Sequence, residues 1–314
     1  MSGSTDAPHR ITGRRKLGLM LALLTTTLWG SLPVALKTLL ATMSPLSVTW
    51  YRYAISALLL TAFLRWRGGR LPIPPDLRKL APLLAVAAIG FTGNNILFLA
   101  GLNRVGPSAS QVVIQLAPVL LIVAGVVVFH EPFSFRQWLG VAVLLGGMAL
   151  FFHRGVAAAI ASPGVLLIVL AAALWAGYAM AQKQLLRNLP SLTVLWTAYV
   201  CGALFLLPVA TPTQALRLDP FGWVVLAYCC LNGVIAYGSF AESMSHLEVS
   251  RVSAVLATTP LFTPIFSELA ARQWPDRVAR EGLDWLQLAG GLLVAAGSVL
   301  AALARKQEKE EGTH

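Results

Sequence analysis

The sequence predicts an all-α integral membrane protein with ten transmembrane helices, arranged as two inverted five-helix repeats. Of the 314 residues, 57% are hydrophobic and only 12% are charged, whereas soluble domains carry roughly 25% charged residues. Ten apolar segments also follow one another along the chain, each close to the about 20 residues that a helix needs to cross a bilayer. We expect these helices at 17–40, 46–64, 80–101, 107–129, 135–153, 163–186, 191–209, 222–242, 250–270 and 284–304.

The second half of the chain repeats the first. Without any gap, matched positions recur at an offset of 146 residues (175 − 29 for the first pair): Trp29 and Trp175, Lys37 and Lys183, Trp50 and Trp196. Shared tryptophan and lysine positions are not explained by a common richness in leucine and alanine. Each repeat contains five helices, and because five is an odd number, the second repeat should enter the bilayer in the opposite orientation.

The later part of each repeat aligns at a changing offset. Pro118 matches Pro260 at an offset of 142 residues, and Gly140 matches Gly290 at an offset of 150 residues. The change implies about eight extra residues before the last helix, in the polar stretch 272–282. The predicted organisation is therefore a tail at 1–16, one repeat at 17–155, a second at 156–304, and a tail at 305–314.

The basic residues are distributed unequally between the two sides of the predicted bundle. The net charge is +11, from 24 Lys and Arg against 13 Asp and Glu. Sixteen of the 24 basic residues fall on the side of the two tails and six on the other side, while Lys37 and Arg52 lie inside predicted helices. This bias follows the positive-inside rule and predicts that both termini are cytoplasmic. The charge thus indicates a lipid bilayer as the partner, and not nucleic acid.

Several short motifs resemble one known family. They are Leu28-Trp29-Gly30, Trp50-Tyr51-Arg52-Tyr53, His130-Glu131-Pro132 and Gln137-Trp138-Leu139-Gly140. In their order and duplication, from about residue 17 to 304, the chain resembles EamA-type members of the drug/metabolite transporter superfamily. One departure is the longer loop before the last helix, where Glu281 is a displaced match to Glu131.

The resemblance implies five plus five helices around a central cavity, lined by the first four helices of each repeat. It also implies a bacterial inner membrane protein that exports small metabolites, such as amino acids or drugs. Helices 135–153 and 284–304 would then lie at the periphery. Their glycines are expected to serve close packing, either within the chain or between the protomers of a homodimer.

Polar side chains inside the predicted helices are the first candidates for the cavity lining, because they are costly in hydrocarbon. Arg52 lies about two turns into its helix, and the following two helices offer Asn94, Asn95, Gln111 and Gln115. We expect these side chains to line one polar cavity that binds a carboxylate or other polar group of a substrate. The alternative is a network of hydrogen bonds that only holds helices together.

Aromatic side chains form the second set of candidates. They are Trp29, Trp175, Tyr178, Tyr199 and Tyr237. Aromatic faces and hydroxyl groups of this kind suit an amphipathic ligand, although core packing explains them equally well.

Four further residues are candidates for gating. Pro118 and Pro260 are expected to kink the helices at 107–129 and 250–270, because proline removes a backbone hydrogen bond. Glu268 is at a depth where it would meet Arg52 or Lys37, and such a pair would form part of an outer gate. For Lys37, the alternative is that its long side chain reaches the lipid headgroups.

The sequence also lacks the motifs of other membrane-protein classes. No G-x-x-x-x-G-K-[ST] segment is present, so an ATP-driven pump is not expected. No cluster of histidines and carboxylates lies within the predicted helices, so we expect neither an enzyme nor a metal or other cofactor. The resulting prediction is a secondary transporter that exports a small polar or amphipathic metabolite by alternating access. The alternative is a membrane scaffold or lipid-binding protein without transport activity.

Overall fold

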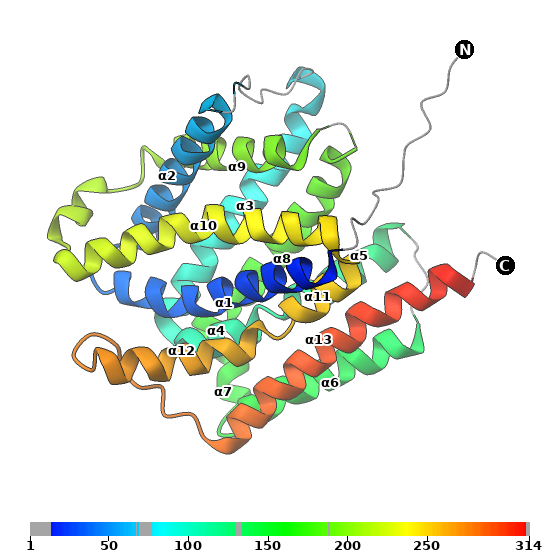
Figure 1. Cartoon of the computed structure of the whole chain (residues 1–314). Coiled ribbons are helices and arrows are strands. Elements are labelled where there is room, and N and C mark those ends of the chain that lie inside the picture. The colour runs from blue at the N-terminus through cyan, green and yellow to red at the C-terminus, as the bar shows by residue number, and fades with distance from the viewer. Residues whose placement is uncertain (1–13, 67, 69–76, 130–133, 188, 312–314) are drawn as a thin grey trace, which may run out of the picture.

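The structure is a computed structural model that describes residues 14–66, 68, 77–129, 134–187 and 189–311. Throughout these ranges, the regular secondary structure is helical (Figure 1). The first half contains α1 (Arg15–Leu39), α2 (Pro45–Trp66), α3 (Leu77–Val105), α4 (Pro107–Val113), α5 (Leu116–Phe129) and α6 (Phe135–Phe151). The second half contains α7 (Val156–Ala161), α8 (Pro163–Leu185), α9 (Ser191–Leu206), the 3-10 helix η1 (Pro212–Arg217), α10 (Pro220–His246), α11 (Val249–Leu256), α12 (Thr259–Gln273) and α13 (Trp285–Glu311).

Several of these helices have the length and composition of membrane spans. Five segments are long and apolar enough to cross a bilayer: Arg15–Leu39, Arg78–Val105, Pro163–Leu185, Pro220–His246 and Arg251–Gln273. Four shorter apolar segments accompany them: Pro107–Leu121, Phe135–Phe151, Ser191–Leu206 and Trp285–Ala301. The fold is thus that of an all-α protein that crosses the membrane several times.

Two of the expected helices are each divided into two. In place of single helices at 107–129 and 250–270, α4 ends at Val113 before α5 begins, and α11 ends at Leu256 before α12 begins. The cause lies in Pro118 and Pro260, which have no N–H to donate to the carbonyl group four residues earlier. The prolines therefore stand in the first turns of α5 and α12, and not at kinks inside continuous helices.

Other groups donate hydrogen bonds to the carbonyl groups that these prolines leave without a partner. The carbonyl oxygen of Ile114, four residues before Pro118, accepts a hydrogen bond from the N–H of Ala117 at 2.9 Å. The carbonyl oxygen of Leu256, four residues before Pro260, accepts a hydrogen bond from the hydroxyl of Thr259. Neither proline therefore leaves the carbonyl group four residues earlier unpaired, which would be costly in hydrocarbon.

The main helix pairs each combine one helix from the first half of the chain with one from the second. α1 packs along α10, α3 along α8, α6 along α13 and α2 on α9. Figure 1 shows α1 beneath α10, and α6 beside α13 at the edge of the bundle. The two halves of the chain are thus interleaved, and a site at the centre receives side chains from both.

Glycines bring α6 and α13 into close contact. A Cβ atom on Gly147 would lie 2.8 Å from the carbonyl oxygen of Gly290, and one on Gly297 would lie 2.6 Å from that of Gly140. These glycines serve packing within the chain. Gly146, on the same helix as Gly147, has no atom within 4 Å of the place where a Cβ would stand.

These contacts predict unequal effects of two matched substitutions. Gly297→Ala puts a methyl group 2.4 Å from the backbone nitrogen of Leu144 and should lower the free energy of unfolding by about 1–3 kcal/mol. Gly146→Ala should leave it unchanged or raise it by up to about 1 kcal/mol, since alanine favours helix. Thermal unfolding of the two purified variants in detergent measures the difference, and equal stabilities would contradict this account of the α6–α13 contact.

Candidate functional site

The centre of the bundle holds a cluster of aromatic rings around Phe91 on α3. Phe91 is 1% exposed. Its ring centroid lies 5.3 Å from that of Tyr53, 5.0 Å from Tyr178, 5.7 Å from Tyr199 and 6.3 Å from Tyr237. Most of these pairs are tilted or edge to face, which suits the charge distribution of aromatic rings. Phe91 and Tyr53 were not among the residues expected from the sequence, because an aromatic residue in an apolar helix reads as ordinary core.

Two tryptophans extend the cluster in opposite directions. The ring of Trp29 on α1 lies 5.4 Å from Tyr237, and that of Trp175 on α8 lies 5.3 Å from Tyr178. The five aromatic residues expected at the site therefore come together from four helices, α1, α8, α9 and α10. Ring contact alone is also what core packing would give, so the polar groups beside the cluster are the informative ones.

Arg52 on α2 is a buried charge next to this cluster. Arg52 is 8% exposed, and its Nη1 donates to Oδ1 of Asn95 at 3.1 Å. The amide of Asn95 in turn donates to the carbonyl oxygen of Phe91 at 3.0 Å. Within the described residues, the Nε of Arg52 has no hydrogen-bond partner. None of the ion pairs recorded in the described part of the chain involves Arg52.

Three buried hydroxyl groups near the rings also lack partners within the described residues. They belong to Thr92, Tyr178 and Thr197. Thr92 follows Phe91 on α3, and Thr197 precedes Tyr199 by two residues on α9. By contrast, the hydroxyl of Tyr53 donates to the carbonyl oxygen of Phe91 at 3.1 Å. Most buried polar groups are hydrogen-bonded, so a group of unpaired ones calls for an explanation.

Of the remaining amides expected in the same cavity, Asn94 contacts Asn95, whose amide donates to its Oδ1 at 3.4 Å, whereas Gln115 lies elsewhere. Asn94 points to α8, where its amide donates to the carbonyl oxygen of Ala171 at 2.9 Å. Gln115 donates to the carbonyl oxygen of Ala257 at 3.4 Å and to the hydroxyl of Ser298 at 3.3 Å. Gln111 is buried in α4. The structure thus joins Arg52 and Asn95 to the aromatic cluster, whereas Asn94 ties α3 to α8 and Gln115 contacts α11–α13.

Gln115 connects the two helix breaks. Gln115 and Ala257 are 142 residues apart (257 − 115), the same offset that relates Pro118 to Pro260. One break therefore donates a side-chain hydrogen bond to the matched position of the other. α4 also packs against α12. The two broken helices thus meet at their discontinuities.

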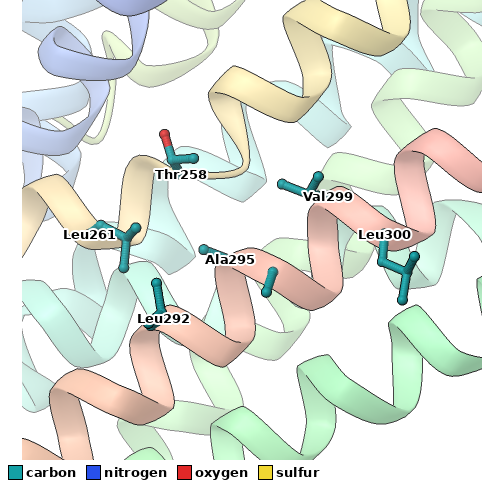
Figure 2. A pocket seen from close by; sticks show the side chains of 7 residues that line it. Thr258, Leu261, Leu292, Ala295, Val299 and Leu300 are labelled. Atoms are coloured by element: carbon teal, nitrogen blue, oxygen red, sulfur yellow. The ribbon is translucent and has the colours of Figure 1, made fainter.

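An apolar crevice opens beside the second break, between α12 and α13 (Figure 2). Its volume is about 410 Å³, and its lining consists of Thr258, Leu261, Leu292, Ala295, Ala296, Val299 and Leu300. The hydroxyl of Thr258 donates to the carbonyl oxygen of Val255 at 2.6 Å. The crevice therefore offers hydrocarbon walls and is distinct from the Arg52 site.

Among the described residues, Glu268 pairs with cations other than Arg52 and Lys37. It contacts Arg272, one turn further along α12, at 2.7 Å, and Arg280 in the connection before α13 at 3.9 Å. Lys37 donates to the side-chain oxygen of Asn103 at 3.2 Å. A gating role for Glu268 and Lys37 stays a prediction. His130 and Glu131 lie outside the described residues.

Comparisons with known proteins identify the family. The model of the EamA-like transporter family matches the chain twice, at residues 16–153 and 162–303. The chain belongs to the EamA-like transporter family. A transporter of Haemophilus influenzae is 37% identical to it over 294 residues, covering 92% of this chain and 96% of the relative. The inner membrane transporter YhbE of Escherichia coli is 37% identical over 297 residues, covering 92% of both chains.

The fold has a solved counterpart. One crystal structure matches with a TM-score of 0.63 and 18% identity, covering 93% of this chain and 99% of the other. At that identity the likeness supports the fold alone. Together, the family, the relatives and the apolar helices show a multi-pass membrane transporter.

The unequal bonding of the two tyrosines predicts that their hydroxyls have different roles. Tyr53→Phe removes a hydrogen bond to the backbone and should lower the free energy of unfolding by about 0.5–1.5 kcal/mol. Tyr178→Phe removes a hydroxyl that has no partner, so the transporter should lose no stability. Chemical unfolding of both variants in detergent decides this. A loss of stability in Tyr178→Phe as large as in Tyr53→Phe would show that the Tyr178 hydroxyl has a structural partner.

Proposed function

We propose that the protein is a secondary transporter that exports a small polar or amphipathic solute bearing a carboxylate, such as an amino acid. The observation that supports this proposal is the incomplete pairing of the buried charge of Arg52. A charge inside a membrane-spanning helix is costly and is usually paired. In the part of the chain that the structure describes, Nη1 of the guanidinium has a neutral amide partner and Nε has none. A carboxylate of the solute would supply the missing charge and could accept two parallel hydrogen bonds from a guanidinium.

The surroundings of Arg52 suit a solute that also has an apolar part. The rings of Phe91, Tyr199 and Tyr237 offer apolar surfaces, and Arg52 is linked to them through Asn95, which donates to the backbone of Phe91. The unpaired hydroxyls of Thr92 and Tyr178 offer hydrogen bonds to the polar groups of the solute. A small number of polar groups within a mainly aromatic lining is the usual composition of a small-molecule site.

Alternating access would follow from two five-helix repeats in opposite orientation. The breaks in α4–α5 and α11–α12 stand at matched positions, which supports related roles for the two pairs. Discontinuous helices at the interface of repeats are typical of sites in secondary transporters. With both termini in the cytoplasm, as the distribution of basic residues favours, export moves the solute toward the end of the bundle remote from the termini.

Binding measurements on matched variants test the role of Arg52. Amino acids and their carboxamide analogues would be screened for stabilisation of the purified transporter against thermal unfolding. A solute at 100 times its Kd stabilises by about 2.7 kcal/mol. Arg52→Gln should abolish the stabilisation by the carboxylate form, whereas Arg187→Gln, which neutralises an exposed charge after α8, should preserve it.

The same variants are then compared for solute movement in proteoliposomes without ATP. Arg52→Gln should reduce the uptake or efflux of the identified solute by at least about tenfold, the effect of losing a hydrogen bond to a charged group. Equal transport of the carboxylate and its carboxamide by the parent protein, or unchanged transport by Arg52→Gln, would rule out the proposed site.

A further inference from the structure

The connection between α12 and α13 makes polar contacts with several other connections of the bundle. It comprises residues 274–284, which we call the clasp segment. It lies at the end of the bundle remote from the described ends of the chain, Arg15 and Glu311 (Figure 1). The sequence comparison of the two repeats assigns about eight extra residues to this region. The segment is therefore where the second repeat departs most from the first.

Arg277 joins the clasp segment to the connection between α9 and α10. Its Nη2 lies 2.5 Å from Oδ2 of Asp219, and its guanidinium lies 5.9 Å from the ring centroid of Phe221. Trp274 packs against the same ring at 5.4 Å. A hydrogen bond from the N–H of Gly222 and the nearby charge of Arg277 lower the pKa of Asp219. The carboxylate is thus charged at neutral pH, and the pair is intact.

Glu281 joins the clasp segment to the start of α4 in the other repeat. Its carboxylate accepts one hydrogen bond from the backbone N–H of Ser108 at 2.9 Å and a second from the Ser108 hydroxyl. Both bonds are charge-assisted, which makes them stronger than bonds between neutral groups. Because α4 packs against α12, this contact fixes the two helices to each other at their outer ends.

Asp284 forms the third connection, to the end of α6. Its Oδ2 lies 2.8 Å from Nη2 of Arg154 and 3.3 Å from Nε2 of His153. Asp284 also accepts a hydrogen bond from the N–H of Gln287 at 2.9 Å and so caps α13. That backbone bond, together with the charges of His153 and Arg154, lowers the pKa of Asp284. Two of the three connections therefore bridge the two repeats.

The connection between α9 and α10 is itself bonded to the turn between α1 and α2. The N–H of Ser44 donates to the side chain of Gln214 at 2.8 Å, and the hydroxyl of Tyr51 donates to the carbonyl oxygen of Pro212 at 3.0 Å. Polar contacts thus link the five connections at this end to one another: α1–α2, α3–α4, α6–α7, α9–α10 and α12–α13. On the opposite side of the breaks, α5 packs against α8, whereas α11 packs against α1 and α13.

We propose that the clasp segment holds this end of the transporter closed and must release before a solute can pass there. The proposed passage of solute at this end requires α4 and α12 to separate, and Glu281 bonds α4 to the segment that follows α12. Single exposed ion pairs contribute little, but several that share one short segment are broken together when the segment moves. The extra residues give the connection enough length to reach three neighbours.

Cysteine accessibility in nanodiscs tests this without any solute, so its outcome is independent of the Arg52 site. Cys201, Cys229 and Cys230 are first replaced by alanine. Two buried reporters are then made, Ser267→Cys in α12 near the clasp segment, and Ala22→Cys in α1 toward the other end; these positions are 3% and 0% exposed. The reaction rate of each with a water-soluble maleimide is measured in the parent background and with Glu281→Ala or Arg277→Ala.

The proposal expects Glu281→Ala to raise the labelling rate at position 267 by about tenfold, the effect of losing a hydrogen bond to a charged group, and to leave position 22 unchanged. Glu281→Gln keeps an acceptor for Ser108 and should give a smaller increase. The control Glu242→Ala removes a carboxylate at the other end of α10 and should have no effect at position 267. Unchanged labelling at position 267, or an equal increase at both reporters that indicates general loosening, would overturn the proposal.

Discussion

The structure depends on one constraint, that each backbone N–H and C=O group in hydrocarbon must find its partner within the protein. Helices meet this constraint everywhere except at proline. Pro118 and Pro260 each withhold one hydrogen bond, and the chain answers by ending one helix and starting another. The freed carbonyl groups then accept from Ala117 and from the hydroxyl of Thr259. Two helix breaks thus exist in which the carbonyl group left free by proline has a partner.

The same constraint explains why the breaks meet each other. A carbonyl group at the end of a helix can accept a further hydrogen bond, and Ala257 accepts one from Gln115 at the matched break. That bond joins the two repeats at a point where each can bend. A movement of one break would therefore change the environment of the other, as the proposed alternating access requires. The glycines bring α6 and α13 into close contact beside the broken helix α11–α12, which packs against α13.

Some polar groups at the centre lack hydrogen-bond partners among the described residues, unlike the carbonyl groups at the breaks. Around Phe91 the rings fill space well, yet Arg52, Thr92 and Tyr178 retain unpaired polar atoms. A structural core of this composition would be stabilised by replacing such groups with apolar ones. In the proposed function these groups would be fully paired only while the solute is bound, which would serve both its binding and its release.

The sequence contained enough information for the helices but not for the pairing of their polar side chains. Helix bounds follow from apolar length, so the expected 163–186 and 46–64 differ little from α8 and α2. Five residues of the aromatic cluster, Trp29, Trp175, Tyr178, Tyr199 and Tyr237, were also recognisable as aromatic residues inside helices, whereas Tyr53 and Phe91 resemble ordinary core. Gln115 was expected beside Arg52 because positions 111 and 115 share a face of a continuous helix. The break before α5 removes that continuity, and a one-residue change in where a helix ends redirects the side chains that follow.

Contacts of the clasp segment were beyond the reach of sequence reasoning for a further reason. The partners of Glu281 and Asp284 lie on connections more than a hundred residues away, and loop geometry sets which charges meet. The extra length of this connection was nevertheless visible as a changed repeat offset. If the repeats are inverted, as the sequence predicts, equal connections would give the two ends of the bundle equal closing energies. An insertion in one repeat alone would make the ends unequal, and in the proposed cycle this inequality favours closure of the end that carries the clasp segment.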